Sequence, residues 1–280
     1  MVNWGYRAAR LRGKFTRWWY EQRSQSLTRR PLPSAPQLNA SIYTLSCQRD
    51  FPEQVACLRS FLTFVGVPQQ FVIISDGSYT LEASQQLERI HPCVQVVQLL
   101  EFANPELPPP VFDYMRSNSM GKKLLAILSI PISGTTVYTD SDIFFFPGAK
   151  ALAELLQTDD GQSYYLPDND PAFDLRILNP GEEAKPINGG FIVFKQQPDW
   201  QEVMNRFLAL SEPPNYFTEQ TMMHLTLHRL GAKPLERDRY IMGREDEFMW
   251  RDRYAETDIV LRHYVTPVRH KFWGNWRYLR

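Results

Sequence analysis

The segment Gln70-Phe-Val-Ile-Ile-Ser75 is a short apolar run that ends at the turn residues Asp76-Gly77-Ser78. Four consecutive apolar residues do not suit a strand with one face in water, because successive side chains of a strand point to opposite faces. They suit a strand in a sheet that is covered on both faces, as in proteins with parallel strands and flanking helices. The run therefore favours a layered fold with helices on both sides of a sheet.

The rest of the chain repeats this alternation of short apolar runs and helical segments. Strands are expected at 41–46, 70–75, 94–99, 134–140, 163–166 and 190–195, and helices at 51–64, 81–90, 119–128, 149–156, 200–210 and 218–230. Residues 101–115 contain four prolines and are expected to be a loop. Strands that alternate with helices indicate βαβ units. We therefore expect an α/β fold with a mainly parallel central sheet flanked by helices.

The first 38 residues differ from the rest in charge and composition. The chain has 280 residues and a net charge of zero, yet residues 1–30 carry eight basic residues against the single acid Glu21. Aromatic residues interleave with the basic ones, and the prolines of residues 30–36 are typical of a linker. We expect residues 1–38 to be a basic aromatic segment with its linker, and residues 39–280 to be the globular domain. The basic segment is either a helix at an anionic membrane surface or a solvated, partly docked helix.

Charge and cysteine content bear on partners and compartment. The zero net charge gives no indication of nucleic acid as a partner. The three cysteines form no CxxC pair, which favours buried thiols in a reducing compartment. No apolar run is long enough for a membrane span, and the N-terminus lacks the apolar region of a secretory signal. We expect a cytoplasmic protein, with peripheral membrane contact through residues 1–30 as an open alternative.

The strongest chemical signal is the pair Asp140 and Asp142 in Val137-Tyr-Thr-Asp-Ser-Asp142-Ile-Phe-Phe-Phe. Carboxylates two residues apart lie on the same side of an extended chain, so both can reach one cation at the end of a strand. Mg²⁺ and Mn²⁺ prefer oxygen ligands and often bind one or two carboxylates together with substrate phosphates. Two alternatives are a solvated turn and a haloacid-dehalogenase-type phosphatase. The phosphatase motif usually stands near the start of its domain, whereas three strands precede this one.

Other short motifs surround this pair in a fixed order: Thr44-Leu45-Ser46, Asp76-Gly77-Ser78, Lys123-Leu124, Asn188-Gly189-Gly190, Thr218-Glu219-Gln220 and His263-Tyr264. With these motifs, residues 40–275 resemble the nucleotide-sugar glycosyltransferases of the GT-A fold, nearest to glycogenin-like and related bacterial enzymes. The resemblance implies that Asp140 and Asp142 bind Mn²⁺ or Mg²⁺ and that His263 completes the metal shell. It also implies a nucleotide-diphosphate donor, such as a UDP- or GDP-sugar.

The resemblance assigns further residues to the donor. These are nucleoside contacts at Thr44 and Asp76, a phosphate contact at Lys123, and residues that face the sugar at Asn188, Glu219 and Gln220. The chain departs from the glycogenin-like pattern at Thr266, where that pattern has Gly, and at Arg269, where it has Lys. Its Asp-Gln pair is also Glu-Gln here. The subfamily, and with it a retaining or inverting outcome, therefore stays open.

The chemistry of some of these residues can be argued separately. An imidazole such as that of His263 can be a third metal ligand, although a lone His is more often structural. Arg269 and Lys271 either neutralise a leaving diphosphate or form a basic surface patch. Glu219 either caps the helix at 218–230 or serves as the base that an inverting reaction needs. Two loop carboxylates either touch the acceptor or make an ordinary turn: Asp168 and Asp170.

We therefore expect a metal-dependent glycosyltransferase that moves a sugar from a nucleotide-diphosphate donor to a carbohydrate, lipid-linked or protein acceptor. Two other classes stay open. One is a sugar nucleotidyltransferase or phosphatase with the same metal site, and the other is a non-catalytic membrane-associated module. The chain lacks the Gly-rich phosphate loop that is typical of sugar nucleotidyltransferases, which argues against that class.

Overall fold

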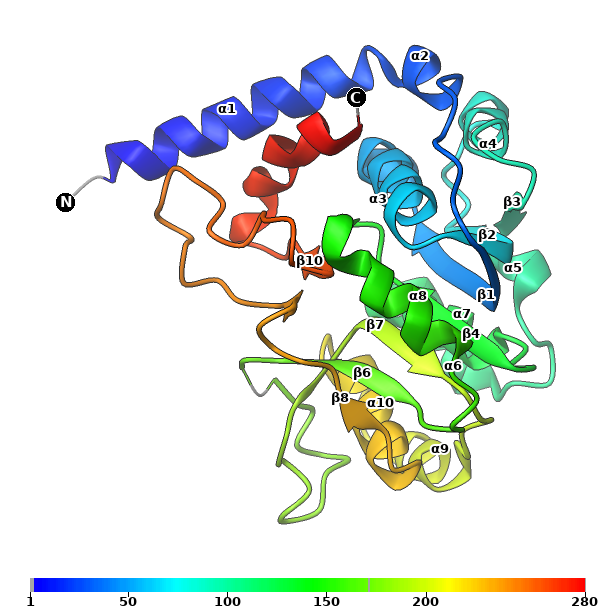
Figure 1. The fold of residues 1–280 in the computed structure, drawn as a ribbon. Helices are drawn as coiled ribbons and strands as arrows, with labels where there is room; N and C mark the ends of the chain where they lie inside the picture. The colour runs from blue at the N-terminus through cyan, green and yellow to red at the C-terminus, as the bar shows by residue number, and fades with distance from the viewer. Residues whose placement is uncertain (1–2, 171, 280) are drawn as a thin grey trace.

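The computed structural model describes residues 3–170 and 172–279. Its main sheet has seven strands in the order β3-β2-β1-β4-β7-β6-β8 (Figure 1). The bounds are β1 Gln37–Ser46, β2 Val67–Ser75, β3 Val94–Gln98, β4 Thr135–Thr139, β6 Tyr164–Pro167, β7 Ile187–Phe194 and β8 Lys233–Pro234. Strands β3, β2, β1 and β4 are parallel, and β7 is antiparallel to both β4 and β6. The predicted α/β fold with a mainly parallel sheet is confirmed.

Helices connect the strands and cover the sheet. They are α1 Trp4–Glu21, α2 Ser24–Thr28, α3 Phe51–Phe64, α4 Leu81–Glu88, α5 Leu99–Phe102, α6 Pro109–Ser117, α7 Ser119–Ser129, α8 Lys150–Gln157, α9 Gln201–Leu208 and α10 Thr218–Arg229. Each helix expected from the sequence is present within a few residues. The expectation of a loop at 101–115 is wrong, because α6 begins at Pro109. Its prolines occupy the first helical positions, where their missing N–H groups have no helical partner to lose.

The apolar run of β2 contributes side chains to both hydrophobic clusters of the protein. Phe71 and Ile73 belong to one hydrophobic cluster, together with residues of α3 and α8. Val72 and Ile74 belong to a second cluster on the opposite face, together with residues of α7 and α10. All four side chains are buried. The structure thus confirms that this strand is covered on both faces.

A smaller sheet lies beside the carboxyl end of β4. It contains β5 (Ile143–Phe145), β10 (Leu261–His263) and β9 (Tyr240–Ile241) in the order β5-β10-β9. Strand β10 is antiparallel to β5, and the register pairs His263 with Ile143. This pairing brings a residue from the last part of the chain next to the turn that carries Asp140 and Asp142.

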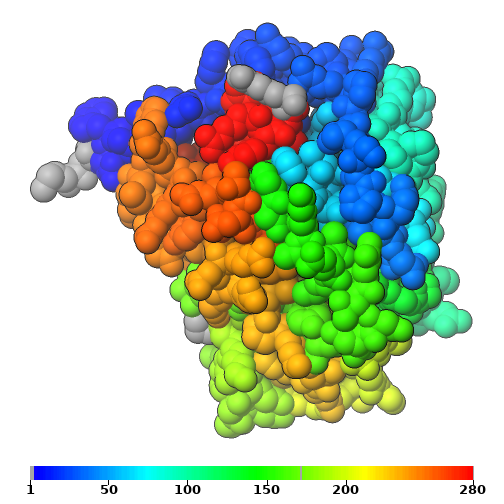
Figure 2. All heavy atoms as spheres, in the orientation of Figure 1, coloured from blue at the N-terminus to red at the C-terminus, as the bar shows by residue number. Residues whose placement is uncertain are grey.

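Helix α1 lies along the 3-10 helix η3 (Val268–Leu279), so the first and last helices of the described chain are side by side (Figures 1 and 2). A Cβ on Gly13 would lie 2.5 Å from the backbone oxygen of His270, so only glycine allows this approach. The ring of Tyr20 packs against Trp273, with 5.0 Å between the ring centroids. The boundary expected at residue 39 falls inside β1. No helix in residues 3–170 or 172–279 has the length and apolar character needed to cross a bilayer.

Candidate active site

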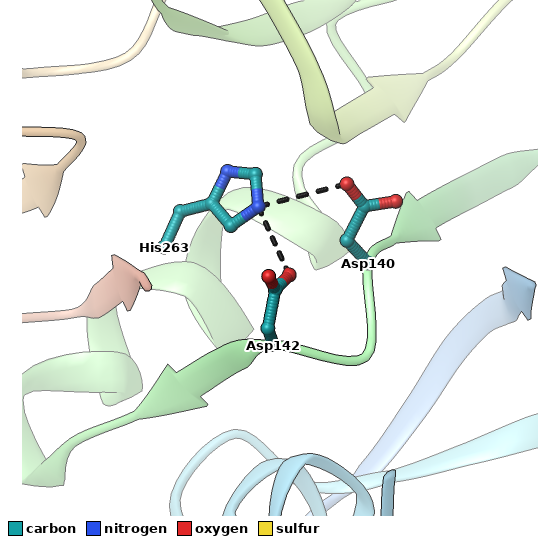
Figure 3. A group of neighbouring side chains, drawn as sticks. All are labelled: Asp140, Asp142 and His263. Atoms are coloured by element: carbon teal, nitrogen blue, oxygen red, sulfur yellow. Dashed lines mark hydrogen bonds and ion pairs between the residues drawn. The ribbon is translucent and has the colours of Figure 1, made fainter. Parts of the chain in front are cut away.

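The turn between β4 and β5 places two carboxylates at the edge of the main sheet. The backbone N–H of Asp140 donates to the backbone oxygen of Gly190 in β7 at 2.7 Å, which holds the start of the turn against the sheet. His263 Nε2 lies 3.0 Å from Asp142 Oδ1 and 3.6 Å from Asp140 Oδ2 (Figure 3). One ligand atom from each of these three residues lies within 4.8 Å of the other two. Residues 121 positions apart are thus brought to one point.

The imidazole of His263 is oriented by β7. Its Nδ1 donates to Asn188 Oδ1 at 2.9 Å, and the same oxygen accepts the backbone N–H of Gly190 at 2.9 Å. Because an amide oxygen can only accept, Nδ1 carries a proton and Nε2 is directed at the two carboxylates. A Cβ on Gly190 would lie 2.3 Å from His263 Cε1, so the glycine makes room for the ring. The Asn188-Gly189-Gly190 motif therefore positions a metal-ligand candidate.

The donor set fits a divalent cation. Two carboxylate oxygens suit Mg²⁺ or Mn²⁺, and an imidazole nitrogen is a third donor. A ligating histidine normally donates its other ring N–H to an oxygen, as His263 does to Asn188. The residues that would hold the metal are Asp140, Asp142 and His263.

The charges around Asp142 are balanced by cations. Burial alone would raise the pKa of Asp142, but the nearby His263 and Arg269 outweigh burial and lower this pKa. Arg269 Nη1 lies 3.5 Å from Asp142 Oδ2, and its Nη2 lies 2.8 Å from Asp50 Oδ1. Burial opposes the charged form of His263, yet the carboxylate of Asp142 raises its pKa overall. The carboxylates therefore favour the charged form of this imidazole.

A second layer of polar groups supports Asp140. Lys123 of α7 donates to Asp140 Oδ2 at 2.9 Å, and the hydroxyl of Tyr138 donates to Asp140 Oδ1 at 3.0 Å. Glu219, in the first turn of α10, is almost fully buried nearby. Its Oε1 has no hydrogen-bond partner within residues 3–170 and 172–279. Burial raises the pKa of Glu219 to about 7, although the positive charge of Lys123 opposes this.

A cavity of about 580 Å³ opens above these groups. Its lining includes seven of the residues selected from the sequence: Lys123, Asp140, Asp142, Asn188, Gln220, His263 and Arg269. Such a volume is within the range of pockets that hold small-molecule ligands and cofactors. The cavity lies at the carboxyl end of the parallel strand β4, where open α/β sheets usually bind ligands.

The structure is similar to solved glycosyltransferases. No protein-family model and no curated protein sequence matches the chain. The galactosyltransferase LgtC, solved with donor and acceptor sugar analogues, has a TM-score of 0.53 and 11% identity over 86% of this chain and 100% of its own. Mouse xyloside xylosyltransferase 1 gives 0.52 and 12% identity over 83% and 99%. The Streptococcus pneumoniae glycosyltransferase GlyE gives 0.54 and 11% identity over 86% and 62%.

The chain has the GT-A fold. In this fold the predicted metal motif Asp140-Ser-Asp142 lies on the turn after β4, beside the antiparallel strand β7. The sequence offered two roles for Asp168, an acceptor contact or an ordinary turn. Its carboxylate accepts a hydrogen bond from Asn188 Nδ2 at 3.1 Å and lines the cavity. Asp170 also lines the cavity.

Two polar residues of the candidate site were not predicted from the sequence. Asp50 precedes α3 and pairs with Arg269, and Tyr138 is the β4 residue whose hydroxyl reaches Asp140. Asp50 stands directly before the helix expected at 51–64, which reads as an ordinary helix start. Tyr138 reads as a core aromatic of an apolar strand. Only their tertiary partners distinguish these residues from structural ones.

The two nucleoside candidates lie outside the lining of this cavity. Thr44 is fully buried, and its hydroxyl donates to Gln54 Oε1 at 3.2 Å. The carboxylate of Asp76 pairs with Lys122 at 2.8 Å and accepts from the backbone N–H of Ser78 at 3.1 Å. Both residues stand at or near the carboxyl ends of β1 and β2, the same sheet edge that carries Asp140.

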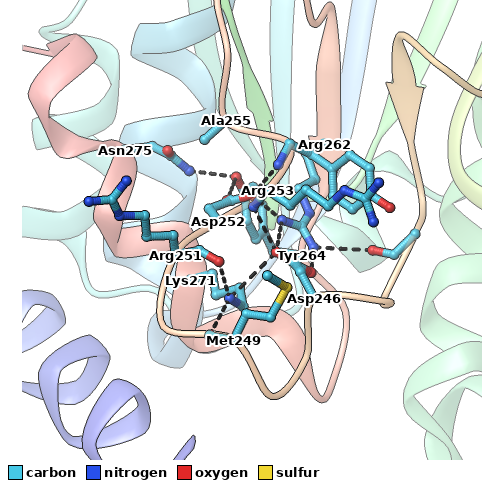
Figure 4. A network of polar contacts seen from close by, with 12 residues as sticks. Asp246, Met249, Arg251, Asp252, Arg253, Ala255, Arg262, Tyr264, Lys271 and Asn275 are labelled. Carbon is cyan, nitrogen blue, oxygen red and sulfur yellow. Dashed lines mark hydrogen bonds and ion pairs between the residues drawn. The ribbon is translucent and has the colours of Figure 1, made fainter. Parts of the chain in front are cut away.

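Lys271 also lies outside the lining of this cavity. Its Nζ donates to the backbone oxygens of Met249 and Arg251 at 2.7 and 2.6 Å and lies 3.4 Å from Asp246 Oδ2 (Figure 4). Residues two apart in a 3-10 helix point about 120° away from each other. Arg269 therefore faces the cavity while Lys271 faces the opposite cluster. This corrects the expectation that both cations assist a leaving diphosphate.

Proposed function

We propose that the chain is a metal-dependent glycosyltransferase that moves a sugar from a UDP- or GDP-sugar to a hydroxyl acceptor. The observation that carries the proposal is the cluster Asp140, Asp142 and His263 at the base of a cavity in a GT-A fold. Structural neighbours with this fold are glycosyltransferases, one of them solved with donor and acceptor sugar analogues. The fold supports the reaction class, and the donor set supports Mn²⁺ or Mg²⁺ as the cofactor.

Each residue of the site has its own role in the proposed sugar transfer. A divalent cation bound at the cluster would stabilise the charge that develops on the diphosphate as the sugar–phosphate bond breaks. Arg269 adds a guanidinium, which suits phosphate oxygens. Lys123 keeps Asp140 oriented from below and adds positive charge. Asn188 holds the His263 ring so that Nε2 faces the carboxylates.

Three residues that line the cavity are proposed to face the sugar and the acceptor: Gln220, Asp168 and Asp170. Gln220 Nε2 lies 3.5 Å from Asp168 Oδ2, so the two side chains form one polar wall. Glu219 is almost fully buried and does not line the cavity. We propose that Glu219 tunes Lys123, and that Asp168 or Asp170 approaches the acceptor hydroxyl. Thr44 and Asp76 remain proposed nucleoside contacts at the same sheet edge.

The proposed location is the cytoplasm. The three cysteines Cys47, Cys57 and Cys93 are all unbridged, which supports a reducing compartment. Contact of the basic segment 1–30 with a membrane is also part of the proposal.

The function can be tested by nucleoside-diphosphate release from a panel of nucleotide sugars. Mn²⁺ should support release, and EDTA or Asp142→Ala should abolish it, because the cation would lose its site. Asp159→Ala, an exposed carboxylate outside the cavity, is the matched control and should behave as the unmodified protein. Release of pyrophosphate or inorganic phosphate instead would indicate a nucleotidyltransferase or phosphatase. A folded protein that neither releases nor binds any nucleoside diphosphate with Mn²⁺ would refute the proposal.

A further inference from the structure

Helix α1 presents an apolar face away from the protein. Four large apolar side chains share that face, and each is between 55% and 72% exposed: Trp4, Leu11, Phe15 and Trp18. At 100° per residue they fall within about 60° of one another. The opposite side of the helix carries the buried residues Ala9, Gly13 and Tyr20, which pack on the protein. The helix is therefore anchored by one face and leaves an aromatic stripe uncovered.

A loop with exposed apolar side chains also contacts α1. The three consecutive residues Phe248, Met249 and Trp250 are about half exposed. The ring of Phe248 contacts Tyr6 at 5.3 Å between centroids, and the guanidinium of Arg12 lies 5.2 Å from the ring centre of Trp250. Figure 2 shows this loop, in orange, against the blue helix.

The loop is held in place by buried charges (Figure 4). Arg262 donates to Asp246 at the base of the loop, and Lys271 donates to the backbone oxygens of Met249 and Arg251. The exposed apolar tip therefore rests on a braced base. We call the exposed stripe of α1, formed by Trp4, Leu11, Phe15 and Trp18, the apolar platform.

The charges around the apolar platform are positive. Four cations of α1 are exposed and form no ion pair within the described part of the chain: Arg7, Arg10, Arg12 and Lys14. The single acid of α1, Glu21, lies 3.4 Å from Arg17 and is partly neutralised. Aromatic side chains flanked by unpaired cations match the interface of an anionic bilayer. A second copy of this surface would instead place like charges against each other.

A basic cavity connects α1 with the metal cluster. Its volume is about 480 Å³, and its lining from α1 includes Arg10, Lys14 and Arg17. Asp50, Thr266 and Arg269 line both this cavity and the one above the metal cluster. Cations of α1 therefore line a cavity that borders the one above the metal cluster.

We propose that the apolar platform docks on an anionic lipid bilayer and that the acceptor is a lipid-linked molecule presented there. The docking stands on the exposed surface alone, whereas the acceptor class rests on the proposed transferase function.

Vesicle flotation tests the docking without any donor or acceptor. The full chain should float with vesicles of phosphatidylcholine and phosphatidylglycerol and remain unbound with phosphatidylcholine alone. The triple variant Trp4→Ala, Phe15→Ala, Trp18→Ala should bind the anionic vesicles about a hundredfold more weakly, because it removes most of the inserting area. The control triple Leu100→Ala, Leu175→Ala, Leu208→Ala removes exposed apolar residues elsewhere and should bind normally.

Charge reversal tests the electrostatic part. Arg7→Glu with Arg12→Glu should weaken vesicle binding by tenfold or more, on the order of the contribution of lipid-facing cations, and added salt should weaken the unmodified chain as well. Lys150→Glu with Lys233→Glu carries the same charge change away from α1 and should have little effect. Equal binding of the aromatic triple variant and the full chain would overturn the proposal. So would self-association without vesicles that the triple variant abolishes, because the partner would then be a second copy.

The docking and the enzymatic proposal fail separately. UDP and GDP binding with Mn²⁺, measured by calorimetry, should be the same in the aromatic triple variant and the unmodified chain. Loss of flotation with intact nucleotide binding supports membrane docking. Flotation without nucleotide binding would retain the docking surface and refute the transferase, and with it the acceptor class. Transfer to a soluble acceptor as fast as to a vesicle-borne lipid-linked one would overturn the acceptor class alone.

Discussion

Two neighbouring residues of β10, Arg262 and His263, belong to two different polar clusters. One cluster is sealed from solvent, and the other borders the cavity. Successive side chains of a strand point to opposite faces, so each residue meets its own pair of aspartates. Arg262 meets Asp246 and Asp252 in a cluster sealed from solvent, where the side chains of Arg262 and Asp246 are 0% exposed. His263 meets Asp140 and Asp142, whose side chains are 23% and 14% exposed at the cavity floor.

The difference lies in how each cluster balances its charge. In the sealed cluster Arg262 Nη2 donates to Asp246 Oδ1 at 2.6 Å and to the backbone oxygen of Gly243 at 3.1 Å. Burial alone would raise the pKa of Asp246, but its ion pair with Arg262 lowers it. The open cluster instead directs carboxylate oxygens at a space that a ligand can enter. Similar residue types therefore brace a loop on one side of β10 and form a candidate metal site on the other.

The largest effect is expected where the sealed cluster is broken. Arg262→Met should lower the free energy of unfolding by about 3–5 kcal/mol, because it leaves Asp246 buried without its main partner. Denaturant unfolding measures this loss. The control Arg116→Met removes an exposed partner of the exposed Asp113 and should change stability by about 0.5 kcal/mol or less. A loss as small as that of the control would contradict the bracing role of the cluster.

Breaking the open cluster should affect activity and leave most of the stability intact. Asp142→Asn should reduce nucleoside-diphosphate release by roughly 10²–10³-fold, comparable to removing one group that stabilises transition-state charge. Its unfolding free energy should fall much less than that of Arg262→Met, because the site is open to water. Release assays with Mn²⁺ and parallel unfolding curves check both parts. If Asp142→Asn unfolded as readily as Arg262→Met, the distinction between the two clusters would be lost.

The raised pKa of Glu219 predicts that the stability of the fold depends on pH. Its folded pKa of about 7 lies above its usual value of 4.5, so the folded state keeps a proton that the unfolded state loses between these values. This group therefore stabilises the fold least at high pH, and its contribution declines as pH rises from about 4.5 to 7. The pKa difference corresponds to roughly 3 kcal/mol at most.

Glu219→Gln removes that titration. The variant should gain stability relative to the unmodified chain as pH rises through the window from about 4.5 to 7. Unfolding curves at several pH values measure the difference. Parallel curves for the two proteins would show that Glu219 titrates normally and that the positive charge of Lys123 offsets its burial.

The smallest expected effect is on nucleoside-diphosphate binding, and it distinguishes Arg269 from Lys271, two cations of η3. Arg269→Gln should weaken nucleoside-diphosphate binding about tenfold, because it removes a charged hydrogen-bond donor from the cavity. Lys271→Gln should leave that binding unchanged, since Lys271 faces Asp246 and the loop instead. Calorimetric titration with UDP or GDP and Mn²⁺ compares them. Equal weakening by both variants would place Lys271 back at the site.

Short sequence motifs predicted much of the candidate site. The pair Asp140 and Asp142 could be placed at a strand end because the strand before it is apolar and the spacing is two residues. Asn188 was also found, because its motif is rich in glycine, although its contact with His263 could not be seen. The expectation for Lys271 failed for a structural reason. The sequence places Lys271 near His263, but it does not show that Lys271 and Arg269 point in different directions from the same 3-10 helix.

The sequence by itself determined the local features of this protein: the two-faced strand β2, the order of helices and strands, and the carboxylate pair at the end of β4. These follow from periodicity and spacing, which depend on residues close together in the chain. Only the tertiary structure decided which distant residues meet, such as His263 with Asp142 and Arg262 with Asp246. It also decided that α1 packs through Ala9, Gly13 and Tyr20 and leaves its aromatic stripe outside. Burial and register across β10 set these outcomes, because both depend on how separate elements pack together.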